Sequence, residues 1–483
     1  MEPTIAAAVL IVFVVACAWY RFKPNFNLHP VPLLALSVVL TGSVLGSEFF
    51  SLPSGPIPIT LDRILIGATV ALFAWYYLRG KEDLRRLNTA DITILLLMAV
   101  IFTSTITHDW TFLEKMPASR LLFFNLLPLA VYWVVRSCKL GPAELKFIAT
   151  SMGVFGVYLA LTAIAEVKDV TALIYPKYIL TSEIKEFLGR GRGPFLNPVS
   201  NGICMTTCFC CLLMWWPRVG RRGKFIALGL GLVLAVGVYA TLTRSVWLGF
   251  VAACGIFIWI PASRPAKGGM IIVATLVAVV SFPVLSENIF SFKRDKEVSQ
   301  SAMEQSAQMR PMFALIAWNM FQDRPIVGCG FGQYAREKYP YLQDPHSGKP
   351  LSVTKSLMQH NVFLAYVTET GIIGLSCLIL MLMQMTRVSW KVFCNRSADL
   401  WARQFGLVSL VILACYCLNG MFHDVSIIPM QHMLMFFIFG IVNNIDSKPR
   451  AFRLVWTTSP SRSNARRTRV RANQPNQLEQ KSA

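Results

Sequence analysis

Apolar runs of about 18 or more residues recur along almost the whole of this sequence. Each run is long enough to cross the hydrocarbon core of a bilayer as a helix, the element that satisfies its own backbone polar groups there. Hydrophobic residues make up 54% of the chain and charged residues only 15%, far from the average of soluble proteins. The sequence therefore predicts an all-α polytopic membrane protein.

The runs predict about 12–13 transmembrane helices. The first run, Ile5 to Tyr20, follows Glu2 and no basic residues, which favours a retained span over a cleaved signal peptide. A twelve-helix version leaves that run at the periphery. The expected spans are 4–20, 31–49, 59–78, 91–108, 119–135, 147–165, 199–216, 224–242, 245–260, 269–286, 361–386, 404–421 and 426–444.

These spans divide the chain into four parts. Residues 1–286 form an N-terminal transmembrane bundle, 287–360 a long polar loop, and 361–446 the C-terminal transmembrane helices. Residues 447–483, rich in Ser, Arg, Asn and Gln, are predicted to be a disordered basic tail.

The long loop is predicted to contain one helix of its own. Apolar residues recur with helical spacing from Gln300 to Phe321, which is typical of an amphipathic helix at a membrane interface. Pro311 is expected to break or restart this helix, because proline removes a backbone donor and clashes with the preceding turn.

The net charge of +21 reflects topology and not nucleic-acid binding. Lys and Arg lie mainly in alternate connecting segments and in the tail, which is how cytoplasmic segments are marked. The long loop then lies on the outward side of the membrane and the C-terminus in the cytoplasm. The basic tail is expected to bind the headgroups of membrane lipids.

The twelve cysteines predict no disulfide framework, because nine of them lie in expected spans. The group Cys204, Cys208, Cys210 and Cys211 is interpreted as lipid-facing small hydrophobic residues and not as a soft-metal site. The motifs H-E-x-x-H, G-x-S-x-G and Walker A are missing from the sequence. We expect no metal or other cofactor.

Arginines from distant parts of the chain fall on the predicted outward side. Arg190 and Arg192 precede span 199–216, Arg244 lies in a short turn between spans, and Arg310 lies in the long loop. Guanidinium groups match the oxygens of a diphosphate, and they stabilise charge on a departing diphosphate. The alternative is that such arginines reach lipid headgroups from helix ends.

His360, at the end of the long loop, is the natural proton acceptor, and its alternative role is to cap the next helix. Glu369 lies nine residues further, about 13–14 Å down a helix. A carboxylate inside the bilayer is rare and usually functional; it either pairs with an arginine or locks two helices together. His423 is a candidate to complete the same cavity. The Gly328–Gly332 segment predicts tight turns and close backbone approach.

The order and spacing of four motifs, RGPFLNPVSNG, TRSVWLG, DRPIVGCGFGQY and HNVFLAYVTETGIIGL, resemble the O-antigen ligase and O-antigen polymerase superfamily. The resemblance implies an inverting membrane glycosyltransferase of the GT-C type in the bacterial inner membrane. Such enzymes take a glycan from an undecaprenyl-diphosphate carrier at the periplasmic face and transfer it to an acceptor hydroxyl without a metal. The segment after Asn197-Pro198 departs from the simplest pattern, since Val-Ser-Asn replaces Pro-Asn.

The resemblance also implies roles for individual residues. Arg192, Arg244 and Arg310 correspond to the family's arginines, and His360 corresponds to the histidine of its His-Asn pair. The resulting expected catalytic residues are His360, Arg244 and Arg310, and the expected substrate-binding residues are Arg190, Arg192, Asn197, Asn361, Glu369 and His423.

Several functions share these residues. The acceptor is lipid A–core for a ligase, a growing lipid-linked glycan for a polymerase, or a protein for an O-glycosylating enzyme. The alternative from a different class is a transporter of a small solute such as inorganic carbon, which predicts ionisable residues along the membrane midplane and inverted repeats. The polar residues gather at one face instead, which favours the enzyme.

Overall fold

The computed structural model describes residues 28–46, 49–52, 58–181, 187–272, 300–343, 351–355, 357–428 and 430–448. Within these residues the fold is helical, and its only β-pairing is an isolated bridge between Leu52 and Ile59. Eight of the described helical segments are long and apolar enough to cross a membrane. The prediction of an all-α polytopic membrane protein is confirmed.

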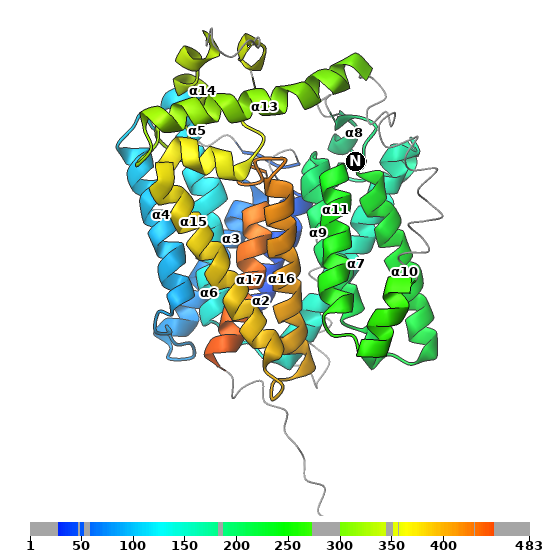
Figure 1. Ribbon diagram of the computed structural model, residues 1–483. Helices are drawn as coiled ribbons and strands as arrows, with labels where there is room; N and C mark the ends of the chain where they lie inside the picture. The colour runs from blue at the N-terminus through cyan, green and yellow to red at the C-terminus, as the bar shows by residue number, and fades with distance from the viewer. Residues whose placement is uncertain are drawn as a thin grey trace, which may run out of the picture.

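Most helices run side by side in one bundle (Figure 1). α5 (Phe112–Leu121) continues through a π-helical segment, Leu122–Leu126, into α6 (Leu127–Ser137). The other bundle helices are α2 (Pro30–Val44), α3 (Leu61–Leu78), α4 (Thr89–Ile106), α7 (Pro142–Val167), α9 (Pro198–Leu213), α10 (Arg221–Ala240), α11 (Arg244–Cys254), α15 (Val362–Cys394), α16 (Leu400–Gly420) and α17 (Gln431–Ser447).

Eleven of the expected spans coincide with these helices within a few residues at most ends. The larger differences are that α2 ends at Val44, α15 continues to Cys394, and α17 begins at Gln431. The expected span 4–20, most of 269–286 and the tail from 449 lie outside the described residues. The boundaries between the four predicted parts stay predictions.

α17 lies at the centre of the bundle because its sequence is apolar on every side. Phe436, Phe437 and Ile441 are all buried, as are most of its other residues. By contrast, α10 exposes Phe225 and Leu232, as expected of a helix that faces lipid. The interpretation of the four cysteines of α9 as lipid-facing is wrong, since all four are buried where α9 packs against α7, α10, α11 and α16.

α13 (Gln300–Asp323) lies across one end of the bundle, here called the α13 end (Figure 1). The predicted helix is confirmed, but the expected interruption at Pro311 is wrong, because the helix continues through it. Phe313, Ile316 and Met320 lie on the buried face of this helix. Their packing stabilises the helix at Pro311, where proline removes one backbone hydrogen bond.

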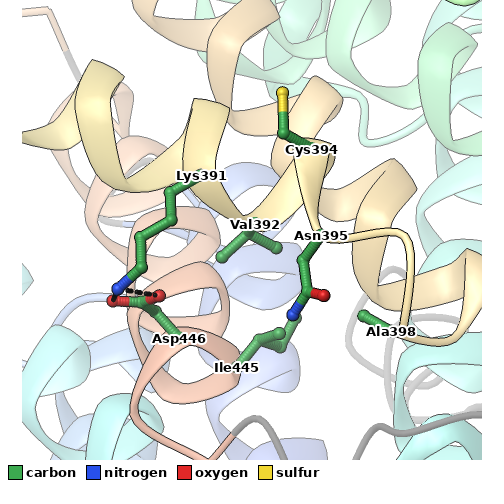
Figure 2. A pocket seen from close by; sticks show the side chains of 7 residues that line it. All are labelled: Lys391, Val392, Cys394, Asn395, Ala398, Ile445 and Asp446. Carbon is green, nitrogen blue, oxygen red and sulfur yellow. Dashed lines mark hydrogen bonds and ion pairs between the residues drawn. The ribbon is translucent and has the colours of Figure 1, made fainter.

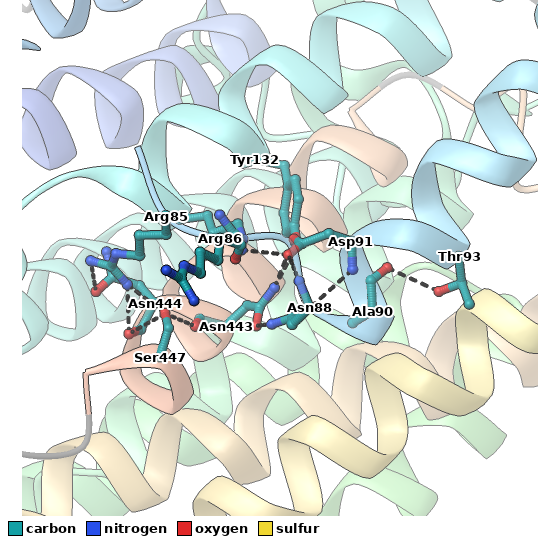
Figure 3. Close-up of polar contacts among 11 residues, drawn as sticks. Arg85, Arg86, Asn88, Ala90, Asp91, Thr93, Tyr132, Asn443, Asn444 and Ser447 are labelled. Carbon is teal, nitrogen blue, oxygen red and sulfur yellow. Dashed lines mark hydrogen bonds and ion pairs between the residues drawn. The ribbon is translucent and has the colours of Figure 1, made fainter. Parts of the chain in front are cut away.

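A buried polar network fixes the opposite end of the bundle. The Asp91 carboxylate of α4 accepts hydrogen bonds from Tyr132 OH at 2.5 Å, from Asn443 Nδ2 at 3.1 Å and from Arg136. Figure 3 shows how Asp91 and Asn88 meet Tyr132 from α6 and Asn443 from α17. Every partner is paired across helices, so this network joins α4, α6 and α17 far from α13.

Candidate functional site

α15 is broken at Gly371, where the backbone has φ 63° and ψ −164°. In a continuous helix, the N–H groups of Ile372 and Ile373 would bond to the carbonyls of Thr368 and Glu369. At the break these four backbone groups need other partners, because buried N–H and C=O groups are costly to leave unpaired.

The loop segment after α13 supplies all four partners. Ile372 N donates to Pro325 O at 2.9 Å, and Ile373 N donates to Ile326 O at 3.4 Å. In return, Cys329 N donates to Thr368 O and Gly330 N donates to Glu369 O, each at 2.9 Å. We call these four hydrogen bonds the helix-break clamp. They fix the loop segment 325–330 against the α15 residues 368–373.

Glycine is required on both sides of the clamp. A Cβ at Gly371 would lie 2.2 Å from Ile326 O, and one at Gly328 would lie 2.5 Å from the carbonyl carbon of Glu369. Gly328 also has a positive φ of 72°. The predicted tight turns and close backbone approach of the Gly328–Gly332 segment are confirmed.

Glu369 pairs with an arginine that the sequence reasoning missed. Arg120 Nη1 lies 2.8 Å from Glu369 Oε1, and Arg120 Nη2 lies 3.9 Å from Asp424 Oδ2. All three side chains are buried. Burial raises the pKa of Asp424 to about 6, although Arg120 opposes that shift. An arginine inside an expected span, 119–135, was the sequence signal that could have identified Arg120.

Arg310 and His360 lie on one small aromatic cluster at the α13 end. The Arg310 guanidinium lies over the Phe422 ring at 5.4 Å from its centroid. The imidazole of His360 meets Phe313 edge-on, with the ring centroids 5.4 Å apart. Arg310 and Phe313 are one turn apart on α13, so this helix brings the two predicted catalytic residues to the same place.

Asn361 and His423 join this cluster through the turn that follows α16. Asn361 Oδ1 caps α15 by accepting from Phe363 N at 2.8 Å, while its Nδ2 donates to Met421 O at 3.1 Å. His423 N donates to Asn419 O at 2.8 Å. The structure therefore gathers Arg310, His360, Asn361 and His423 around residues 421–424, with Asp424 linking them to Arg120 and Glu369.

The remaining predicted residues form a second group at the start of α9 and α11. Arg190 Nη2 donates to Thr243 Oγ1 at 2.8 Å, and Thr243 directly precedes Arg244, which opens α11 with an exposed side chain. Buried Arg192 lies 3.6 Å from Glu166 Oε1 and donates to Ile179 O at 2.7 Å. The Arg190 contact fixes the turn that carries Arg244, and the Arg192 contacts fix its own loop against α7 and α8 (Tyr178–Thr181).

Asn197 belongs to the second group as a helix cap. Its Oδ1 accepts from Val199 N at 2.9 Å and from Ser200 N at 3.1 Å, at the start of α9. The two groups are joined by the packing of α11 on α16, where a Cβ at Gly249 would lie 3.1 Å from Asn419 Nδ2. Asn419 lies just before the 421–424 turn, so both groups face the α13 end.

The chemistry available at this end is that of guanidinium, imidazole and carboxylate groups. Within the described part of the chain, no three His, Cys, Asp or Glu side chains come together as a metal site would require. The arginines offer permanent charge and forked donors, and His360 offers a proton acceptor.

A second missed residue, Lys338, anchors the segment that leads to His360. Its Nζ donates to Thr354 O at 3.1 Å and to Leu357 O, and its side chain is almost completely buried. The Tyr334 ring lies 5.4 Å from Nζ. Burial lowers the pKa of Lys338 to about 8, so the ammonium remains protonated at neutral pH. A lone lysine in a polar loop carries no sequence signal of this role.

We expect Lys338→Met to destabilise the protein by about 1.5–3 kcal/mol, because the two carbonyls lose a charge-assisted donor. Lys338→Arg should restore much of the loss. The matched control is Lys355→Met, at an exposed lysine of the same loop. Thermal unfolding midpoints of all three variants test this; equal midpoints for Lys338→Met and Lys355→Met would contradict it.

A cavity of about 360 Å³ lies between the ends of α15, α16 and α17, at the opposite end of the bundle. Figure 2 shows Lys391 and Asp446 paired on one side of it, with Nζ and Oδ1 2.9 Å apart. None of the predicted site residues lines this cavity. It is separate from the candidate site.

Comparison with known protein families gives a match to part of the chain. Residues 205–379 match the family model described as O-antigen ligase. The comparison with individually curated proteins gave no match. The matched segment contains Arg244, Arg310, His360, Asn361 and Glu369, together with the whole helix-break clamp. Residues 205–379 are therefore similar to the O-antigen ligase family, which supports the resemblance to the O-antigen ligase and O-antigen polymerase superfamily that the sequence motifs indicate.

Proposed function

We propose that this protein transfers a glycan from an undecaprenyl-diphosphate carrier to an acceptor hydroxyl. The observation that carries the proposal is the gathering of Arg310 and His360 on the Phe313 and Phe422 rings, at the end where Arg244 opens α11. Cations for a diphosphate and a base for a hydroxyl are the two requirements of such a transfer.

In the proposed reaction, Arg244 and Arg310 bind the diphosphate of the donor. Both side chains are exposed at the α13 end, so their guanidinium groups are accessible to a lipid-linked substrate. Arg190 and Arg192 are assigned a positioning role. Arg190 holds the turn before α11 through Thr243, and Arg192 holds the loop before α9 through Glu166 and Ile179.

His360 accepts the proton of the incoming hydroxyl. The hydroxyl oxygen attacks the anomeric carbon as the bond from that carbon to the diphosphate oxygen breaks, which inverts the anomeric configuration. The departing lipid diphosphate takes the electron pair, and the arginines stabilise the charge that develops on it. Asn361 and His423 position the acceptor beside His360, and Glu369 with Arg120 holds α15 below them.

The proposed location is the bacterial inner membrane, with the α13 end in the periplasm and the C-terminus in the cytoplasm. Basic residues in alternate connecting segments support this orientation. The acceptor is proposed to be lipid A–core or a growing glycan. Deletion of the gene distinguishes the two, since loss of a ligase leaves long unattached chains and loss of a polymerase leaves single repeats.

Transfer in proteoliposomes that contain the lipid-linked glycan tests the proposed site. We expect Arg244→Ala and His360→Ala each to lower kcat about 100- to 1,000-fold, as removal of one transition-state donor does in other enzymes. Arg336→Ala serves as the control, because Arg336 is an exposed arginine at the same end, 3.5 Å from Asp109. Wild-type transfer by Arg244→Ala or His360→Ala would show that these residues are not the catalytic groups.

A further inference from the structure

A second cavity lies at the α13 end, among the last turn of α2, the first turn of α3 and the first turn of α17. Its volume is about 320 Å³, which is at the small end of the range for ligand sites. Thr60, Asp62 and Arg63 line one side, and Phe123, Phe195 and Met430 are among its apolar walls. We call it the Thr60 cavity.

Three polar atoms that line the cavity lack hydrogen-bond partners among the described residues. They are Thr60 Oγ1, Asp62 Oδ1 and Arg63 Nε, and each is shielded from solvent. Thr60 is only 1% exposed. Buried polar atoms are nearly always paired in proteins, and an unpaired one costs about 1–3 kcal/mol. Three such atoms in one cavity indicate a site that a polar ligand completes.

The position of Thr60 strengthens this argument. Thr60 directly precedes α3, where a threonine hydroxyl normally accepts a hydrogen bond from the first turn of the helix. Here the hydroxyl makes no such bond. The Thr60 side chain therefore does not stabilise the start of α3 as a cap, and it lines the cavity instead.

The charges that line the cavity indicate which class of ligand it can bind. Asp62 and Arg63 are of opposite sign, so the polar side has no net charge to attract a phosphate or a cation. Arg63 is held in place over the Phe123 ring, 4.0 Å from its centroid, and donates from Nη1 to Pro58 O. Donors and acceptors of zero net charge beside apolar surfaces fit a ring that carries hydroxyl groups on an apolar frame.

One wall of the cavity is adjacent in the chain to a residue of the candidate site. Pro194 and Phe195 line it and directly follow Arg192 and Gly193 in the chain. Tyr178 OH donates to Pro194 O at 2.8 Å, which fixes this wall. A ligand in the cavity therefore lies against the residues that directly follow Arg192 and Gly193.

We propose that the Thr60 cavity binds an uncharged, hydroxyl-bearing sugar ring of one of the two glycan substrates. This inference rests on the proposed glycan transfer. The Thr60 hydroxyl and the Asp62 carboxylate bind hydroxyl groups of the sugar, and the apolar walls contact the face of its ring. The Thr60 cavity then determines which sugar is accepted, whereas other residues bind the diphosphate and the attacking hydroxyl.

Kinetics of purified protein in proteoliposomes, with lipid-linked donor and acceptor varied separately, test the proposal. We expect Thr60→Val and Asp62→Asn each to raise the KM of one substrate about tenfold while kcat changes less than about twofold. A rise in the donor KM assigns the cavity to the donor sugar, and a rise in the acceptor KM assigns it to the acceptor sugar. Thr60→Ser keeps the hydroxyl and should behave as wild type.

Thr107→Val is the matched control, at an exposed threonine of the segment that follows α4 at the same end. If both KM values stay within about twofold of wild type in Thr60→Val and Asp62→Asn, or if only kcat falls, the sugar site is refuted. Should Thr60→Val unfold, Asp62→Asn with Thr60→Ser decides the question. His360→Ala separates the two proposals: an inactive His360→Ala beside unaffected Thr60→Val refutes the sugar site alone, whereas an active His360→Ala refutes the proposed function.

Discussion

Replacing Arg120 with methionine is expected to destabilise the protein by about 3–5 kcal/mol, because it leaves two buried carboxylates without their cation. Arg120 lies 2.8 Å from Glu369 and 3.9 Å from Asp424, and all three are buried. The thermal unfolding midpoint in detergent measures the effect. Neutralising both carboxylates in the same protein, with Glu369→Gln and Asp424→Asn, should recover most of the loss.

The loss in Arg120→Met is also expected to depend on pH. The pKa of Asp424 is raised from 3.8 to about 6. Between pH 3.8 and pH 6 the folded state therefore holds a proton that the unfolded state has lost, and this stabilisation disappears as pH rises through 6. Removing Arg120 raises that pKa further, since the cation opposes the shift. The deficit of Arg120→Met should therefore be smaller at pH 5 than at pH 8.

Arg324→Met provides the control for this prediction. It breaks an ion pair with Glu337 at 3.0 Å whose arginine side chain is 51% exposed. Exposed pairs contribute about 0–1 kcal/mol. Equal unfolding midpoints for Arg120→Met and Arg324→Met would mean that the buried ion pairs contribute no more to stability than the exposed one.

Alanine at Gly371 is expected to cost about 3–6 kcal/mol and to abolish transfer. The backbone there, φ 63° and ψ −164°, is almost restricted to glycine and costs other residues about 1–3 kcal/mol. A Cβ would also lie 2.2 Å from Ile326 O and push the loop away. The four hydrogen bonds of the helix-break clamp, each worth about 1 kcal/mol, would be lost with it.

Gly67→Ala and Gly229→Ala are the matched controls, since a Cβ at either of these helical glycines meets no atom within 4 Å. They should be neutral or stabilising by about 0.5–1 kcal/mol. Unfolding midpoints and transfer rates of the three variants compare the effects directly. A Gly371→Ala protein that retains both would show that the loop does not depend on the clamp.

The sequence predicted the parts of this fold that depend on long local patterns. Apolar runs located most helices, and the spacing in Gln300–Phe321 located α13. The prediction that Arg310 and His360 lie at one end of the bundle came from alternation of the connecting segments, and the structure places both on the Phe313 and Phe422 rings. Their catalytic roles stay predictions.

The features that the sequence did not predict depend on contacts between distant residues. No periodicity pairs Pro325–Gly330 with Thr368–Ile373, because those hydrogen bonds join main-chain atoms. Arg120 meets Glu369 across 249 positions of the chain. The expected break at Pro311 failed for a related reason: tertiary contacts of Phe313, Ile316 and Met320 outweigh a local preference.

The helix-break clamp has a consequence for how much this loop can vary in length. The four hydrogen bonds fix the number of residues between Pro325 and Gly330. One residue inserted or deleted there would shift the donors and acceptors of the loop away from their partners in α15. The later segment Leu351–Thr354 lies outside the clamp but still packs on α13. Epitope tags and protease sites for following this domain should therefore be kept out of Pro325–Gly330, where any change of length would disturb the clamp.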